Sequence, residues 1–173
     1  MDRLALVEVN GKRVVSLRVI DTLGRPLWKR DLGSVPALPD AENWHYVSVV
    51  DDGIIVGSET WPMSWSLIGN DGQLAFVSAG PDSSSMALLD FTPGEMELHG
   101  APVVQSGTHF LQSVVNLERQ TRVLVTYDLE GTFVRVASAP RLTTLVATVP
   151  GSAEVIGLRR TSPATIVTLS RSQ

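Results

Sequence analysis

The sequence contains, at residues 19–28, the segment Val19-Ile20-Asp21-Thr22-Leu23-Gly24-Arg25-Pro26-Leu27-Trp28. An apolar run leads into a short turn that begins with an aspartate and contains a glycine, and a second apolar run follows. Glycine adopts a positive φ angle without a Cβ clash, so a turn of this kind is typical of the tight connection between two antiparallel strands. The segment therefore predicts a β-hairpin.

The same order of residue types returns at residues 67–76, 88–96 and 126–134, and in a weaker form at 158–166. The turn glycines of the four clearer copies are Gly24, Gly72, Gly94 and Gly131, which are 48, 22 and 37 residues apart. A recurring unit of 20 to 50 residues indicates a repeat architecture. The uneven spacing indicates that at least one unit is short or interrupted.

Apolar and polar residues alternate along most of the chain, as they do where Val15, Leu17 and Val19 share one face. This period of two is typical of strands with two unlike faces. A helix over residues 110–120 is the strongest competing interpretation, and its Ser, Val and Asn residues disfavour it. The predicted strands cover residues 3–9, 13–20, 26–30, 45–50, 54–58, 64–69, 73–78, 85–91, 95–99, 109–116, 121–127, 132–138, 142–148, 154–159 and 164–170.

The hairpin unit resembles the outer hairpin of a β-propeller blade of the WD or PQQ type. Residues 21–33 are similar to PQQ-type repeats, in which a turn glycine precedes a strand that carries Trp. A blade takes about 40 residues, so the resemblance implies a small or partial β-propeller of about four blades. It implies no PQQ chemistry, because no motif here carries a cofactor residue. The alternative is an antiparallel β-sandwich, which the same pattern also fits.

A length of 173 residues predicts a single domain that spans residues 1–173. The chain has no cysteine, which excludes disulfides, thiolate metal sites and thiol nucleophiles. It has no basic leader that runs into an apolar segment, and no run approaches the ~18 apolar residues of a membrane helix. We therefore expect a soluble protein without membrane insertion, cytoplasmic by default.

The net charge of -4 conceals a strong asymmetry along the chain. Residues 31–118 contain no Lys or Arg and 12 acids, whereas the segments on both sides are each net basic. Only 18% of the residues are charged, against a typical ~25%. Both features favour a surface that another protein covers, and the uneven charge would orient that protein. Nucleic-acid binding is disfavoured, since the basic residues are outnumbered and form no platform with aromatic residues.

Candidate catalytic and metal-binding residues are few. The serine run at residues 83–85 lacks the surroundings of a nucleophile elbow, and His45, His99 and His109 form no pair at metal-ligand spacing. The acidic turns around Asp52, Asp71 and Asp128 lack the Asp-x-Asp-x-Asp-Gly series of a calcium loop, and hairpin turns favour acids anyway. We therefore expect no catalytic residues, no metal site and no cofactor.

Three tryptophans, Trp44, Trp61 and Trp65, lie close together in the sequence and are the candidate partner- or ligand-binding residues. A tryptophan in a loop can anchor a protein interface or stack on a sugar ring. The competing interpretation places Trp44 and Trp65 in the core and Trp61 beneath Pro62.

The sequence favours a non-catalytic protein-protein interaction or scaffold subunit of a larger assembly. Two alternatives remain open: a small-ligand or glycan-binding β domain that uses the tryptophans, and a hydrolase whose carboxylates converge only in three dimensions.

Overall fold

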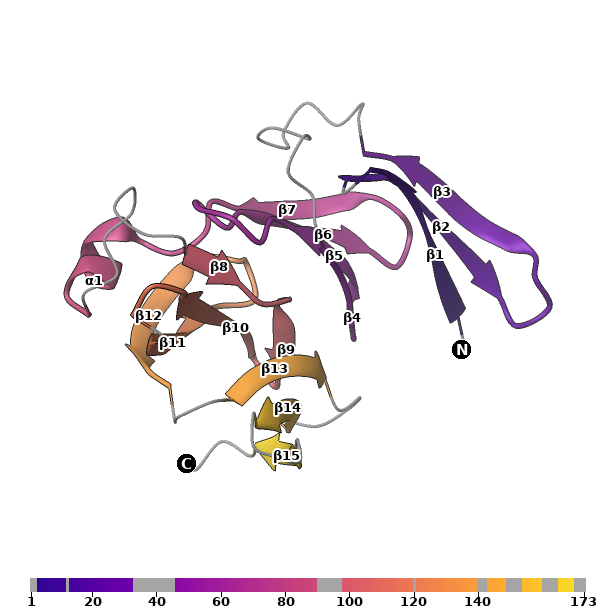
Figure 1. Cartoon of the computed structure of the whole chain (residues 1–173). Coiled ribbons are helices and arrows are strands. Elements are labelled where there is room, and N and C mark those ends of the chain that lie inside the picture. The colour runs from indigo at the N-terminus through magenta and orange to yellow at the C-terminus, as the bar shows by residue number, and fades with distance from the viewer. Residues whose placement is uncertain are drawn as a thin grey trace.

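The fold is almost entirely β-strand, as the antiparallel hairpin pattern predicts (Figure 1). The computed structural model describes residues 3–11, 13–32, 46–89, 98–119, 121–139, 143–148, 154–159 and 165–169. Within these ranges the strands form four antiparallel sheets, and each sheet uses strands that follow one another in the sequence. Neighbouring strands therefore pair through local connections.

The first two sheets come from the N-terminal half of the chain. The first sheet contains β1 (Arg3–Asn10), β2 (Arg13–Asp21) and β3 (Pro26–Asp31), and the second contains β4 (Tyr46–Val50), β5 (Gly53–Gly57), β6 (Trp65–Gly69) and β7 (Leu74–Ser78).

The other two sheets follow in chain order. In the third sheet, β8 and β9 both pair with the same side of β10. Its members are β8 (Leu98–Gly100), β9 (Val104–Ser106), β10 (His109–Asn116), β11 (Thr121–Tyr127) and β12 (Phe133–Ser138). The fourth sheet consists of β13 (Thr143–Thr148), β14 (Val155–Arg159) and β15 (Thr165–Leu169).

The repeated hairpin has the same backbone geometry in the first three sheets. In each turn the residue three before the glycine accepts a hydrogen bond from the glycine N–H, and its own N–H donates to the residue after the glycine. This holds for the turns that contain Gly24, Gly72 and Gly131, all with φ between 77° and 81°. The pairing register also shifts by one residue just after each turn. The three turns and the strand pairs beside them therefore share one backbone geometry.

Consecutive sheets stack face to face. Val19 and Leu17 of the first sheet pack against Ile54 and Ile68 of the second sheet. The opposite face of the second sheet packs on the third sheet through a larger core that includes Trp65. The third and fourth sheets meet at Val104 and Leu145, and β13 also lies beside β4. Figure 1 shows the first and fourth sheets at the two ends of this stack.

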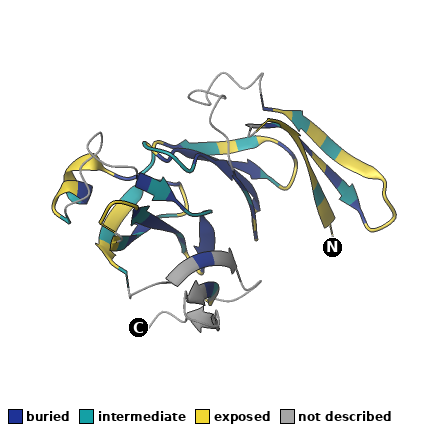
Figure 2. Cartoon of the chain, in the orientation of Figure 1, coloured by how far each residue is buried: buried dark blue, intermediate teal, exposed yellow. Residues whose placement is uncertain are grey.

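Burial follows from the position of each sheet in the stack (Figure 2). The second sheet is covered on both faces, and all five residues of β5 are buried. The first sheet is covered on one face only, and seven of the eight residues of β1 are exposed. Among the residues whose burial is described, the first sheet therefore offers a large free surface.

The structure corrects the sequence prediction at residues 85–91. The predicted strand is wrong there, because α1 (Ser83–Ala87) occupies its first half. Asp82 caps this helix, since its carboxylate accepts hydrogen bonds from the backbone N–H groups of Ser84 and Ser85. The hydroxyls of Ser85 and Ser84 also donate to the carboxylate and lower the pKa of Asp82 to about 2. The serine run is thus the start of a helix.

The other secondary-structure predictions have different outcomes. Residues 109–116 form a strand, so the competing helix over residues 110–120 is wrong. The short strand β9 was not predicted. The repeat copies at residues 88–96 and 158–166 lie largely outside the described residues.

No closed ring is present among the described sheets, so the four-blade propeller stays a prediction. No helix of the described ranges is long and apolar enough to cross a membrane.

Candidate interaction surface

Side chains of the first sheet contact the turn around Gly72 in the second sheet. We call such a contact, between side chains of one sheet and the glycine turn of the next, a joint. The Arg3 guanidinium donates to the backbone carbonyl of Asn70 at 3.1 Å, and the Trp28 indole N–H donates to the same carbonyl at 3.0 Å. Arg30 donates to the carbonyl of Gly72 at 2.7 Å. A turn carbonyl points out of the sheet plane and has no ladder partner, so these bonds satisfy groups that strand pairing leaves free.

The Trp28 ring also lies directly on Gly72. A Cβ atom at Gly72 would lie 2.9 Å from two ring atoms of Trp28, so only glycine allows the ring to come this close. The same arrangement recurs one sheet further, where the Phe76 ring lies on Gly131 so closely that a Cβ atom there would collide with it. Trp28 and Phe76 each follow the turn glycine of their own sheet by four residues. Each joint thus sets an aromatic ring on the turn glycine of the next sheet.

The third copy of this turn, around Gly24, carries no ring. Apart from Gly24 itself and its two neighbours in the chain, no described residue has an atom within 4 Å of a Cβ atom built on Gly24. Ile20 precedes Gly24 by four residues and is partly exposed, whereas the equivalent residues Ile68 and Tyr127 are buried by the preceding sheet. The first sheet therefore carries the receiving half of the joint on its free side.

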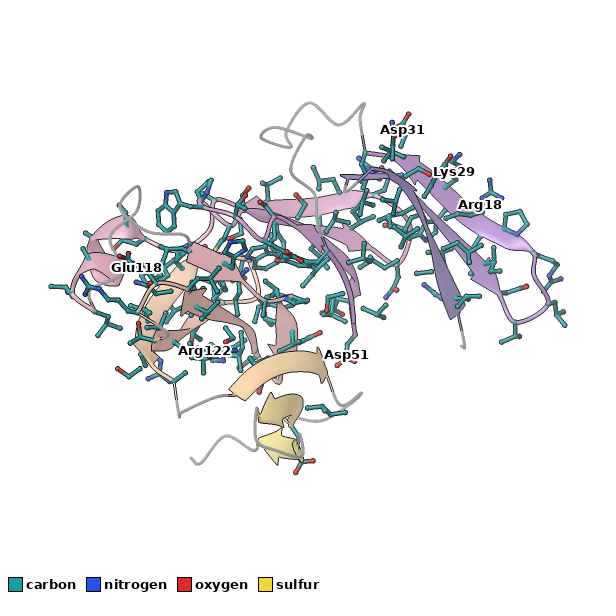
Figure 3. All side chains as sticks on the ribbon, viewed as in Figure 1. Arg18, Lys29, Asp31, Asp51, Glu118 and Arg122 are labelled. Carbon is teal, nitrogen blue, oxygen red and sulfur yellow. The ribbon has the colours of Figure 1, made fainter. Side chains whose placement is uncertain are left out.

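The free side of the first sheet, which we call the outer face, is part apolar and part charged. At one end it carries Leu4, Leu6 and Ile20, which alternate with the inward residues of their strands. At the other end it carries charged side chains, and Figure 3 shows Arg18 and Lys29 pointing away from the second sheet. Apolar area beside charges of both signs is typical of a surface that a protein partner covers.

The charges of the outer face interact with one another. The Ser16 hydroxyl donates to Glu8 at 2.7 Å, and the Lys29 ammonium lies 3.6 Å from the same carboxylate. The hydrogen bond from Ser16 and the charges of Lys29 and Arg18 lower the pKa of Glu8. Ser16, Lys29 and Arg18 therefore favour the ionised form of Glu8, which supplies the negative charge at this end of the face.

Exposed apolar side chains concentrate on the first sheet. Among the described residues, eleven large hydrophobic side chains are exposed, and six of them belong to this sheet and its turn. These six are Leu4, Val9 and Leu23, each more than half exposed, together with Leu6, Val7 and Leu27. Of these, Leu4 and Leu6 lie on the outer face, whereas Val7 and Val9 belong to the set of β1 residues that includes the inward Ala5. Grouped exposed apolar side chains mark interaction sites more often than scattered single residues do.

The three candidate tryptophans do not form one site on the described surface. Trp65 is fully buried and makes edge-on ring contacts with Phe76, Phe110 and Tyr127 at 5.2 to 5.4 Å. It belongs to the core and presents no face to a partner, as the competing interpretation held. Trp61 is partly buried against the same core. Trp44 lies outside the described residues.

The other candidates show structural roles. The carboxylate of Asp71 accepts the N–H of Gln73, and that of Asp128 accepts the N–H groups of Glu130 and Thr132, so both acids stabilise their own turns. In the described ranges no three His, Asp or Glu residues converge in a way that could hold a metal ion. The ring Nδ1 of His109 lies 3.1 Å from the Thr108 hydroxyl, and His45 is outside the described residues.

A buried polar cluster lies between the second and third sheets. The Tyr127 hydroxyl donates to Gln112 at 2.9 Å, and Gln112 donates to the carbonyl of Ala101 at 3.2 Å. Burial raises the pKa of Tyr127 and of nearby Tyr46 well above the ordinary tyrosine value. Both hydroxyls stay protonated at neutral pH, so the cluster specifies packing and supplies no base.

A small pocket lies between the first and second sheets, bordered by Arg3, Trp28, Asn70 and Ile54 among others. Its volume of about 60 Å³ has room for a few water molecules. Pockets for drug-sized ligands measure roughly 300–1,000 Å³. The pocket is therefore part of the joint between the sheets, and the outer face remains the stronger candidate.

Comparison with known proteins adds no relative. A scan against protein-family models, a search of curated proteins and a search of solved structures each found no match.

The outer face was not among the candidate sites predicted from the sequence. One signal was available, because β1 is apolar in both of its alternating sets, with Leu4 and Leu6 in one and Ala5, Val7 and Val9 in the other.

Proposed function

We propose that this protein is a non-catalytic interaction module, a scaffold subunit of a larger assembly. Its sheets act as blades of a small or partial propeller, and the outer face of the first sheet receives a β-sheet from a partner protein. The observation that carries this proposal is the repeated joint. A ring covers the turn glycine at Gly72 and at Gly131, while the equivalent Gly24 is uncovered beside Ile20.

The joint also specifies the chemistry of the partner. Where the first sheet meets the second, it contributes one aromatic ring and two guanidinium groups to the receiving turn. The carbonyls of Thr22 and Gly24 stand where those of Asn70 and Gly72 stand in the second sheet. We therefore expect the partner sheet to present an aromatic side chain with an arginine beside it.

The change Gly24→Asn tests this function. Asparagine tolerates a positive φ better than other side chains, so the turn keeps its shape while the new side chain blocks the approach of a ring. Tagged wild-type chain recovered from its source should have a native mass, by light scattering, that includes a second kind of protein. Gly24→Asn should lose that protein, with a circular dichroism spectrum like that of the wild type.

Gly11→Asn is the matched control, because Gly11 also has a positive φ of 65° and open space at its Cβ position. It lies in the turn between β1 and β2, outside the proposed joint, and should keep the partner. Equal binding by Gly24→Asn and wild type would contradict the proposal, and so would a wild-type chain that never carries a second kind of protein.

A further inference from the structure

Among the described residues, no strand pairs with the outer edge of β1. In an antiparallel sheet, the N–H and C=O of one residue point to the same side, and the side alternates along the strand. Asp21 N–H donates to Arg25, and the Val15 carbonyl accepts from Leu32, so the odd-numbered residues of β2 point toward β3. The even-numbered residues of β2 must then pair with β1.

The residues of β1 that face outward follow from the register. Ile20 and Arg18 lie opposite Leu4 and Leu6, so the even-numbered residues of β1 bond to β2. The N–H and C=O groups of the odd-numbered residues point away from the sheet, and β1 has no strand on that side among the described residues. These outward residues are Arg3, Ala5, Val7 and Val9.

The edge has little of the usual protection against pairing. Natural edge strands carry proline, charged side chains such as lysine, or β-bulges, or are very short. β1 has eight residues with no proline or lysine, and five of the six residues from Leu4 to Val9 are apolar. Its protective features are Glu8 and the bulge between Glu8 and Val9, both at one end. A long apolar edge of this kind is a template for a further strand.

A second copy of β1 fits this edge in one favourable register. A two-fold axis perpendicular to the sheet would pair the two copies of β1 antiparallel. Only when this axis passes beside Leu6 do all four outward residues form hydrogen bonds with the other copy. Leu6 then faces Leu6 of the other copy, Ala5 faces Val7, Leu4 faces Glu8 and Arg3 faces Val9. Apolar pairs occupy the centre on both sides of the sheet, and no like charges stand opposite each other.

We propose that two copies of this chain associate through β1, in an antiparallel pairing centred on Leu6 that joins their first sheets into one six-stranded sheet. The proposal uses the edge of the first sheet, whereas the proposed function uses the outer face, so either can fail without the other. A single strand pair buries less than the ~1,200 Å² of a standard interface, so we expect micromolar affinity.

The change Leu6→Cys tests the register. The chain has no cysteine, so a single introduced thiol can react only with its copy. Leu6 and its counterpart would form a pair without ladder bonds, with Cα atoms about 4.5 Å apart, which suits a disulfide. Under mild oxidation Leu6→Cys should form a covalent dimer in high yield.

Leu4→Cys is the matched control. Leu4 is exposed on the same strand and the same face, but its counterpart would lie about 13 Å further along the paired strands, beyond disulfide reach. It should form at least about tenfold less covalent dimer at equal concentration. Equal yields from the two variants, or no dimer from Leu6→Cys, would overturn the pairing.

The change Val7→Pro tests the edge without a new thiol. The N–H of Val7 points outward, so proline removes one edge donor and leaves the bonds between β1 and β2 intact. By analytical ultracentrifugation, wild type should show a concentration-dependent dimer, which Val7→Pro should weaken at least tenfold and Val7→Thr should retain. A wild type that stays monomeric up to about 1 mM, or a Val7→Pro variant that dimerises like it, would overturn the proposal.

Discussion

Replacing Trp65 with alanine should lower the free energy of unfolding by about 3–5 kcal/mol, because it empties the centre of the largest core. The side chain is fully buried, and its ring meets three aromatic rings that come from the second and third sheets. Its loss removes both apolar burial and ring contacts that join the two sheets. Urea denaturation of wild type and variant measures the difference from the midpoint and the slope.

Trp61→Ala is the control for this prediction. Trp61 is only partly buried and packs at the margin of the same core, so its removal should cost less than half as much. A Trp65→Ala variant that loses under about 1 kcal/mol, or no more than Trp61→Ala, would show that the second and third sheets are not joined through this ring.

Alanine at Gly131 should destabilise the protein by about 2–5 kcal/mol, and alanine at Gly24 by only about 1–2 kcal/mol. The two glycines occupy equivalent positions in turns of the same geometry, with φ angles of 77° at Gly131 and 78° at Gly24. The cost of a positive φ, about 1–2 kcal/mol, is therefore common to both. At Gly131 the new methyl group also displaces the Phe76 ring, and overpacking of this kind adds about 1–3 kcal/mol.

The difference between the destabilisation by Gly131→Ala and that by Gly24→Ala measures the cost of displacing the Phe76 ring from the glycine. The free energy of unfolding of both proteins should be measured by urea denaturation at the same pH and salt. Equal costs at Gly131 and Gly24 would mean that the ring does not rest on the glycine, and the repeated joint would lose its basis.

The strands could be predicted from the sequence because alternation and turn chemistry are local. The three turns that contain Gly24, Gly72 and Gly131 were found from their residue types alone, and they share one geometry. Residues 85–87 were predicted as part of a strand and lie in α1, although Asp82 before a serine run is a helix start signal. The apolar residues that follow Ser85 fit either structure, so periodicity alone did not decide between them.

The candidate interaction surface could not be predicted, because it depends on which sheet faces are covered. Trp61 and Trp65 are four residues apart and look equally available in the sequence, yet only Trp65 sits on a strand between two sheets. Gly24 and Gly72 occupy equivalent positions in turns of the same geometry, and only the stacking order leaves Gly24 without a ring. Local sequence specifies the repeated unit, whereas its place in the stack determines what each copy contacts.

The most direct test of the account is residue-resolved amide hydrogen exchange along β1, measured by NMR at a concentration where the chain is monomeric. The central claim is that β1 is the free edge of an uncovered terminal sheet. The amides of Leu4, Leu6 and Glu8 should exchange slowly because they bond to β2, while those of Ala5, Val7 and Val9 should exchange quickly. Slow exchange at all six amides in the monomer, or fast exchange at all six, would contradict the account.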